Sequence, residues 1–186
     1  MNYEEICRVA AKIKKRYGHT SNPLSLCRDL GFLVNPMNLG TGEDAIKGFI
    51  VENKRLKCIT YNCDLPYREQ MQILWHEIGH GILHPIGMYG YTDILMYDSN
   101  NQKEKEANLF GAEFQLNDSD VFEAMNADTT FSGAAAILGV PMEVLDFKFR
   151  LMKWKGYKLV DPPIYTQGNY LRDFEMPKGE DDYYDC

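Results

Sequence analysis

Residues 67–83 read YREQMQILWHEIGHGIL, and Pro85 follows closely. The spacing of the apolar side chains predicts an amphipathic helix that ends before the proline. Its apolar stripe consists of Met71, Leu74, Ile78 and Ile82. A helix with one apolar stripe must bury it against other elements, so we expect the rest of the domain to assemble around this helix.

The same helix carries His76-Glu77-Ile78-Gly79-His80, an H-E-x-x-H motif. At about 100° per residue the two histidines lie about 40° apart on one face, and Glu77 lies about 60° beyond His80. Two neutral imidazoles on one face can bind one zinc ion, which usually takes a third protein ligand and leaves one position for water. We therefore predict one Zn²⁺ bound by His76 and His80, with Glu77 as the catalytic base that takes a proton from that water.

A third ligand is expected from the next predicted helix, Gln102 to Leu116. On this helix Glu106 shares a face with Phe110, whereas Glu104 points about 160° away, toward the expected solvent side. A carboxylate on an apolar face needs a partner, because burying it unpaired costs on the order of several kcal/mol. Glu106 is therefore the predicted third metal ligand. The alternative is Glu113, further along the same face, which could instead pair with a basic side chain.

His84 continues the row of His76 and His80 by one more turn. It lies too far along the helix axis to share a tetrahedral site easily with both of them. We therefore expect His84 to support the site or to end the helix, with metal binding as the alternative.

The remaining segments favour a mainly helical domain. Helices are predicted over residues 4–17 and 24–30, each closed by a glycine, and over a helical hairpin between residues 130 and 155. Residues 32–34 indicate a short strand, and two β-rich runs, Gly48 to Glu52 and Leu56 to Tyr61, indicate a β-hairpin. The predicted fold class is α+β: mainly helical, with a small antiparallel sheet packed on the H-E-x-x-H helix.

The composition is that of an ordinary globular domain: of 186 residues, 45% are hydrophobic and 25% are charged, so a single buried core is expected. The net charge of −7 argues against a body that binds nucleic-acid phosphates. Much of that charge lies in residues 173–186, which contain six acidic residues and one lysine. We interpret this end as a flexible, solvated tail or, alternatively, as an acidic contact for a basic substrate.

The compartment follows from the N-terminus and the cysteines. The first residues, MNYEEICRVAAKIKKRYG, mix charges among the apolar positions and do not form a signal peptide. No apolar run reaches the length of about 18 residues that suggests a transmembrane helix. The five cysteines contain no C-x-x-C pair, which fits reduced thiols rather than a disulfide framework or a cysteine zinc module. We therefore expect a cytoplasmic protein that does not associate with membranes.

Residues 132–145 have the small residues, the Gly-Val turn and the apolar spacing of a helix-turn-helix. The second helix carries four basic residues, Lys148, Arg150, Lys153 and Lys155. Its N-terminal end, residues 141–143, lacks the polar side chains that usually read base edges. We interpret the segment as a hairpin that packs on the domain or docks a protein, and we expect no direct nucleic-acid binding.

Two stretches together resemble the ImmA/IrrE family of small zinc metallopeptidases. They are Arg68-x-x-Met71-x-Ile73-Leu74-Trp75-His76-Glu77-Ile78-Gly79-His80-x-x-Leu83-His84 and Glu104-x-Glu106-Ala107-Asn108-x-Phe110-x-Ala112-Glu113. The resemblance implies a zincin-like fold over residues 3–155. It implies that the two histidines and the glutamate of the Glu106-Ala107-Asn108 element bind zinc, with Glu77 as the base. Related gluzincins often carry an acidic residue four positions after the glutamate ligand. Counted from Glu106, that position is Phe110, so the residue that supports a zinc-binding histidine stays unassigned.

The resemblance also implies a substrate, because family members of this size cleave helix-turn-helix repressors encoded beside them in phages and mobile elements. We therefore predict a zinc-dependent endopeptidase that cuts such a repressor at a specific site, through attack of zinc-bound water assisted by Glu77. The candidate oxyanion donors are Tyr89, Tyr91 and Tyr97, and the alternative for each is a tyrosine that packs the loop. The alternatives are a non-catalytic, zinc-stabilised sensor or binding module and a DNA-binding regulator.

The predicted domain organisation has three parts. Residues 1–128 form the metallopeptidase domain, and residues 129–160 form the helical hairpin packed on it. Residues 161–186 form the acidic tail.

Overall fold

The computed structural model describes residues 1–42, 44–86, 91–92, 101–127 and 130–160. Over these residues the chain forms seven helices and four strands, which confirms the mainly helical α+β class. The helices are α1 (Tyr3–Tyr17), α2 (Pro23–Leu30), α3 (Tyr67–Leu83), α4 (Asn101–Gln115), α5 (Asp118–Asn126), α6 (Phe131–Ile137) and α7 (Met142–Trp154). The strands are β1 (Leu33–Met37), β2 (Gly48–Asn53), β3 (Leu56–Asn62) and β4 (Tyr91–Thr92).

The described strands form one sheet in the order β1-β3-β2-β4. Strands β2 and β3 are the predicted antiparallel hairpin. The turn residues Lys54 and Arg55 both have positive φ, 50° and 69°, as the tight primed turns of hairpins require. Strand β1, however, pairs with β3 in parallel. The sheet is therefore mixed, and the prediction of a purely antiparallel sheet is wrong.

The parallel pairing follows from the path between β1 and β2. Met37 at the end of β1 and Gly48 at the start of β2 both lie at the C-terminal end of β3, so the connection crosses that end of the sheet. The buried side chain of Asn62 holds this connection: its amide donates to the carbonyl oxygens of Gly40 (2.7 Å) and Ile46 (3.0 Å). Since side-chain bonds rather than a hairpin turn hold the crossing, the periodicity of the strands did not reveal it.

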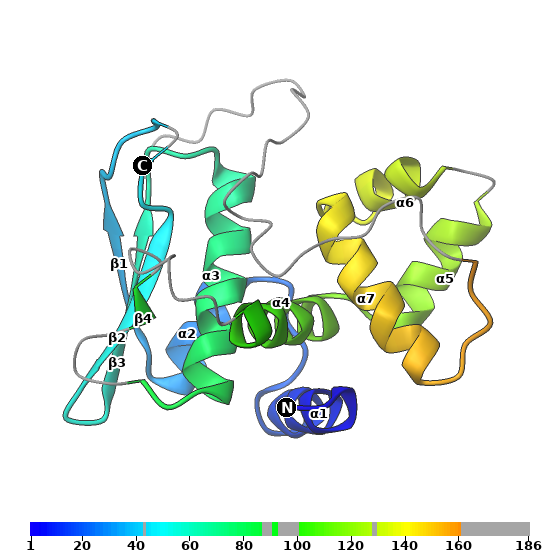
Figure 1. Cartoon of the computed structure of the whole chain (residues 1–186), viewed down its shortest axis with the longest axis horizontal. Helices are drawn as coiled ribbons and strands as arrows, with labels where there is room; N and C mark the ends of the chain where they lie inside the picture. The colour runs from blue at the N-terminus through cyan, green and yellow to red at the C-terminus, as the bar shows by residue number, and fades with distance from the viewer. Residues whose placement is uncertain (43, 87–90, 93–100, 128–129, 161–186) are drawn as a thin grey trace.

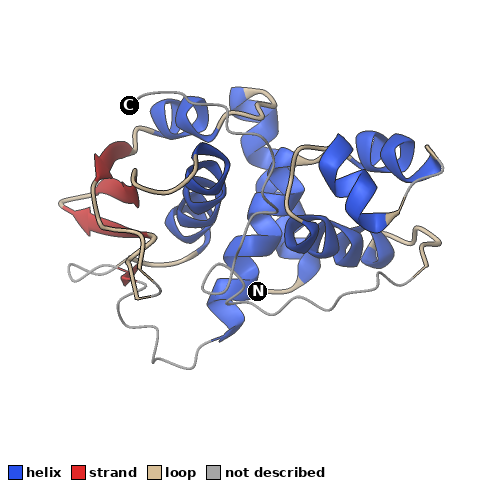
Figure 2. Ribbon diagram, turned by 90° about the horizontal axis from the view of Figure 1, so that it is seen from above, coloured by secondary structure: helices blue, strands red, loops and turns tan. Residues whose placement is uncertain are grey.

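Helix α3 packs against β2 and β3 on one side and against α4 on another (Figure 1). Two glycines allow this close packing. A Cβ at Gly79 would lie 2.6 Å from the carbonyl oxygen of Ala107 on α4, and a Cβ at Gly81 would lie 2.6 Å from the ring of Phe32. Figure 2 shows the helices gathered to one side of the sheet. The H-E-x-x-H helix therefore lies between the sheet and α4.

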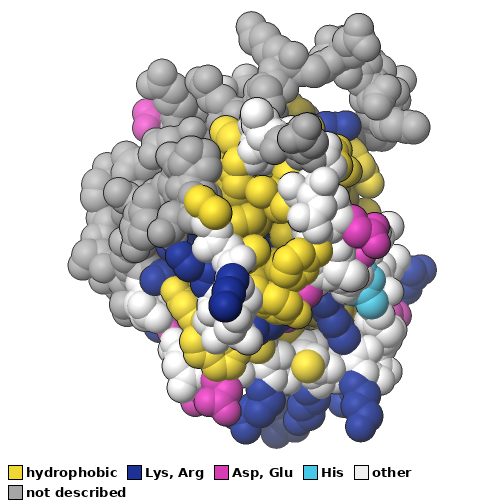
Figure 3. Space-filling model, turned by 90° about the vertical axis from the view of Figure 1, so that its right-hand side faces the viewer, with side chains coloured by type: hydrophobic (Ala, Val, Ile, Leu, Met, Phe, Trp, Pro, Cys, Tyr) yellow, Lys and Arg dark blue, Asp and Glu magenta, His cyan; other side chains and the backbone are white. Residues whose placement is uncertain are grey.

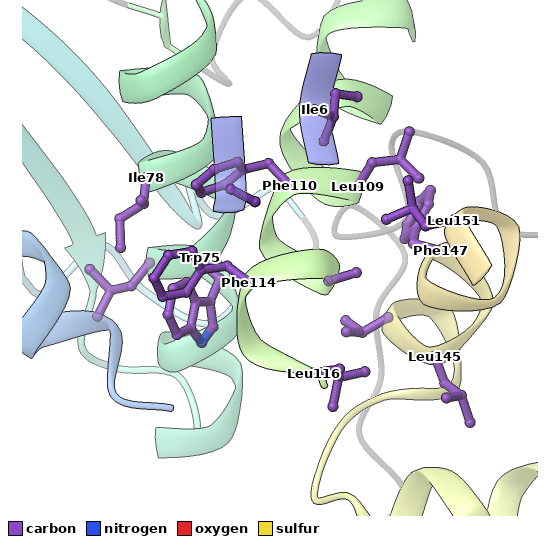
Figure 4. Close-up of a cluster of buried hydrophobic side chains, with 14 of the residues drawn as sticks. Ile6, Trp75, Ile78, Leu109, Phe110, Phe114, Leu116, Leu145, Phe147 and Leu151 are labelled. Atoms are coloured by element: carbon purple, nitrogen blue, oxygen red, sulfur yellow. The ribbon is translucent and has the colours of Figure 1, made fainter. Parts of the chain in front are cut away.

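One apolar core extends from α3 through α4 to α7 (Figure 4). Trp75 of α3 packs against Phe114 of α4 with ring centroids 5.4 Å apart, and on the other side of α4 the core continues to Phe147 and Leu151 of α7. Side chains from residues 1–128 and 129–160 thus share this core, and the division into those two domains stays a prediction.

A buried ion cluster joins α7 to α4 and α5. Lys148 is only 1% exposed, and its Nζ lies 2.8 Å from Glu113 Oε2 and 2.6 Å from Asp118 Oδ1. Lys155 Nζ pairs with the same two carboxylates at 2.7 and 3.0 Å. Burial opposes the ionisation of Asp118, but its bonds to the two lysines outweigh burial and hold its pKa below the ordinary value. Glu113, the alternative metal ligand, is therefore an ion-pair partner of α7.

Most basic side chains on α7 and at its C-cap form ion pairs with carboxylates. Besides Lys148 and the C-cap residue Lys155, Arg150 pairs with Asp146, at 2.5 Å. Figure 3 looks onto the side where α5, α6 and α7 lie in Figure 1 and shows hydrophobic side chains gathered there. Exposed apolar residues of α6 and α7 include Ile137 and Trp154. Three of the four basic side chains of this segment, Lys148, Arg150 and Lys155, are thus engaged in ion pairs.

Some predictions concern parts of the chain that lie outside the described residues. The acidic tail, 161–186, is one of them, and Tyr89 and Tyr97 are two more. Of Tyr91 only the backbone is described, paired with Ile50 of β2. Among the described residues, no helix combines the length and the hydropathy needed to cross a membrane.

Candidate metal centre

Helix α3 presents His76 and His80 side by side where it meets α4. Their Nε2 atoms are 3.0 Å apart, and both side chains are buried. The two rings meet edge to face, with 73° between their planes. The four-residue spacing thus brings the two imidazoles together on one face of the helix, as the motif predicts.

The third group beside these nitrogens is Glu104 of α4. Its Oε2 lies 3.0 Å from His76 Nε2, and its Oε1 lies 3.3 Å from His80 Nε2. One ligand atom from each of the three residues can be chosen so that all lie within 4.8 Å of one another. The helical phase of the sequence predicts Glu106 at this place, and the structure has Glu104 there instead.

The difference arises because α4 does not have the single solvent face that the sequence argument assumed. It packs against α1, α3 and α7, and the consecutive residues 106–114 are all buried. The apolar phase of such a helix cannot tell which side faces α3. The close approach of Gly79 and Ala107 decides it, because Glu104 lies one turn before Ala107 and so points to the same side.

Glu106 contacts His84, which in turn contacts His80 on the side away from its Nε2 atom. His84 Nε2 is 3.1 Å from Glu106 Oε2, and His84 Nδ1 is 3.0 Å from His80 Nδ1. Glu106 Oε1 also accepts a hydrogen bond from Gln102 at 2.8 Å and pairs with the amino group of Met1. Burial opposes the ionisation of Glu106, but these bonds outweigh it and hold its pKa below the ordinary value. Glu106 therefore reaches His80 through His84.

Asn108 holds the other histidine. Its Oδ1 lies 2.7 Å from His76 Nδ1, so the imidazole donates through Nδ1 and keeps the lone pair of Nε2 for the site. Asn108 follows Glu104 by four residues. Counting from Glu106 had pointed to Phe110, which lies in the apolar core. The partner of His76 that sequence reasoning could not assign is therefore Asn108.

The donor set fits a divalent cation such as zinc. Both Nδ1 atoms are engaged in hydrogen bonds, so two Nε2 atoms face each other at 3.0 Å beside a carboxylate. Three electron-pair donors this close repel one another unless a proton or a cation lies between them. Burial opposes the ionisation of Glu104, yet the two imidazoles outweigh it and hold its pKa well below its ordinary range. Two imidazoles and one glutamate form a known ligand set of catalytic zinc sites.

Glu77, the predicted base, follows His76 on α3 and is 1% exposed. Its Oε1 lies 3.6 Å from the position that a Cβ at Gly48 would occupy. The carboxyl group therefore lies between α3 and the first residue of β2.

Comparisons with known proteins show which family the sequence resembles. Residues 27–150 match the sequence profile of the IrrE N-terminal-like domain, Peptidase_M78. The chain is 33% identical over 146 residues to "Uncharacterized immunity region protein 2" of Bacillus phage phi105, an alignment that covers 78% of this chain and 90% of that protein. No solved structure matches the chain.

Proposed function

Since the chain belongs to the Peptidase_M78 family of IrrE N-terminal-like domains, as its resemblance to ImmA/IrrE proteins indicated, we propose that it is a zinc-dependent endopeptidase. His76, His80 and Glu104 hold one zinc ion in this proposal, and Glu77 is the catalytic base. The observation that carries the proposal is the meeting of two imidazole Nε2 atoms and one carboxylate at 3.0–3.3 Å. The buried Glu77 follows His76 directly in the chain.

The roles of the side chains follow from their chemistry. A bound zinc ion supplies a Lewis acid that acidifies water and polarises a carbonyl group. Glu77 accepts the proton of the attacking water and passes it to the nitrogen of the departing amine. Glu77 is 1% exposed, so bulk water does not surround its carboxylate. His76, His80 and Glu104 contribute by holding the ion in a fixed place.

The proposed substrate is a helix-turn-helix transcriptional repressor, cleaved at a specific site. The support is the name of the phage relative, which places that protein in an immunity region, and the family implication of repressor cleavage. A cytoplasmic protease would meet such a repressor where it binds DNA, and a cytoplasmic location is part of the same proposal.

The experiment incubates the zinc-loaded protein with the purified repressor encoded beside its gene, with and without a chelator. Glu77→Gln should keep about one equivalent of zinc and cleave about 100- to 10,000-fold more slowly. The matched control is Glu123→Gln, the same chemical change at an exposed position of α5, and it should cleave like the wild type.

The outcomes separate the parts of the proposal. Equal cleavage by Glu77→Gln and the wild type would end the assignment of the base. Cleavage of an unfolded test protein but not of the repressor would keep the peptidase and refute the substrate. Zinc binding without cleavage of either protein would favour the zinc-stabilised sensor or binding module. Steeply salt-dependent binding to duplex DNA would favour the DNA-binding regulator.

A further inference from the structure

A row of three buried side chains leads away from the proposed metal site. His80 Nδ1 lies 3.0 Å from His84 Nδ1, and His84 Nε2 lies 3.1 Å from Glu106 Oε2. The side chains of His84 and Glu106 are 4% and 5% exposed, so bulk water does not compete with these bonds. The row joins the end of α3 to the first turns of α4.

The carboxylate at the end of the row determines which atoms carry protons. An ionised carboxylate only accepts hydrogen bonds, so His84 must donate to Glu106 through Nε2. The other nitrogen of a neutral His84, Nδ1, is then an acceptor. His80 must therefore donate to it through Nδ1. This leaves the Nε2 of His80 without a proton, beside His76 and Glu104.

We propose that Glu106 and His84 are positioning residues that select the tautomer and the ring orientation of His80 for metal binding. This inference rests on the proposed zinc site. It gives the second glutamate of Glu104-x-Glu106 a role distinct from that of the first: Glu104 touches the ion, and Glu106 acts on it through two imidazoles. Asn108 acts in the same way on His76 but in a single step.

The two histidines are thus supported differently. Asn108 is a neutral partner, and its amide could turn to offer a donor instead of an acceptor. Glu106 has no such freedom, because a carboxylate cannot donate. Its hydrogen bond from Gln102, at 2.8 Å, further holds it in place. The row through His84 is therefore the stronger determinant of which nitrogen is available to the metal.

The test measures zinc affinity by competition with a chromophoric chelator for wild type, Glu106→Leu, His84→Phe and the double variant. Each single variant should bind zinc about 10- to 100-fold more weakly. The double variant should bind zinc about as tightly as the single variant with the lower zinc affinity, because both residues act through the same nitrogen of His80. Losses that multiply in the double variant would overturn the proposal.

A core substitution on α7, Phe147→Leu, controls for stability. Phe147 is buried in the apolar core and takes part in neither bond of the row. Its variant should therefore unfold at a lower temperature and bind zinc within about twofold of the wild type. If it loses as much zinc affinity as Glu106→Leu at an equal loss of thermal stability, the effect of Glu106 is merely structural and the proposal fails.

Nuclear magnetic resonance of ¹⁵N-labelled histidine tests the row without relying on activity. His84 should carry its proton on Nε2 in the wild type and lose this preference in Glu106→Leu. A wild-type His84 protonated on Nδ1 alone would refute the proposal, even if the protein binds no zinc. Absence of zinc binding by the wild type would refute the proposed function instead, so the two failures are distinguishable.

Discussion

Replacing Gly79 with alanine should push α3 and α4 apart and weaken both the fold and the metal site. Alanine favours a helix over glycine by about 1 kcal/mol, which alone would stabilise α3. The new Cβ, however, would lie 2.6 Å from the carbonyl oxygen and 2.8 Å from the Cα of Ala107. These are backbone atoms of a buried helix, so α4 must move as a unit, and overpacking of this kind costs about 3 kcal/mol.

The net destabilisation is therefore about 2 kcal/mol, which lowers the Tm of a domain of this size by about 4–8 °C. The assay is thermal unfolding of the metal-free protein followed by circular dichroism. A zinc titration of the same variant should show weaker binding, because Glu104 lies one turn before Ala107 on the helix that moves.

The matched control is Gly111→Ala on α4. Its Cβ would lie 3.4 Å from the nearest atom, Trp75 Cβ, which is close to ordinary contact. The helix-propensity gain of about 1 kcal/mol should therefore leave its Tm unchanged or raise it by up to about 4 °C. A Gly79→Ala protein as stable as the wild type, or equal losses in both variants, would refute the reasoning about the helix contact.

Three further predictions concern the interior. Lys148→Met removes one buried partner of Glu113 and Asp118 and should cost about 3 kcal/mol of unfolding free energy in a denaturant titration; a loss below about 1 kcal/mol would show that the remaining lysine suffices. Burial opposes the ionisation of Asp118, but its lysine partners outweigh burial and lower its pKa in the folded state. Its contribution to the free energy of unfolding is therefore complete above the unfolded pKa of about 3.9 and is lost as the pH falls through the lower folded value. The stability gap between wild type and Asp118→Asn, measured across pH 2–6, should therefore close toward the acid end, and a gap that widens there would contradict the ion pairing. Burial raises the pKa of Cys27 to about 12, so in the native protein at about pH 8 it should resist alkylation that labels the half-buried Cys58; equal labelling rates in mass spectrometry would exclude a closed core around Cys27.

The sequence was most informative where a local period determines the geometry. The spacing of His76 and His80 predicts both imidazoles on one face of a helix, and in the structure their Nε2 atoms lie 3.0 Å apart. The strand pattern around residues 48–61 likewise predicted the β2–β3 hairpin. Both features depend on residues close together in the chain, so the pattern contains the information.

The choice between Glu104 and Glu106 was not available from such patterns. It depends on which side of α4 faces α3, and a helix enclosed on several sides has no apolar phase that reports this. The signal that could have found it is the four-residue step from Glu104 to Asn108, which places a carboxylate and an amide on one face. The parallel pairing of β1 could not be predicted for a related reason. It depends on the connection between β1 and β2, which Asn62 holds by hydrogen bonds from a later part of the chain.

Anomalous diffraction from a zinc-containing crystal, recorded on both sides of the zinc absorption edge, would locate the metal relative to His76, His80 and Glu104. We expect one ordered zinc bonded to the Nε2 atoms of the two histidines and to the carboxylate of Glu104, with Glu106 hydrogen-bonded to His84. A zinc bonded to Glu106 in place of Glu104, or no zinc between the two histidines, would contradict this expectation.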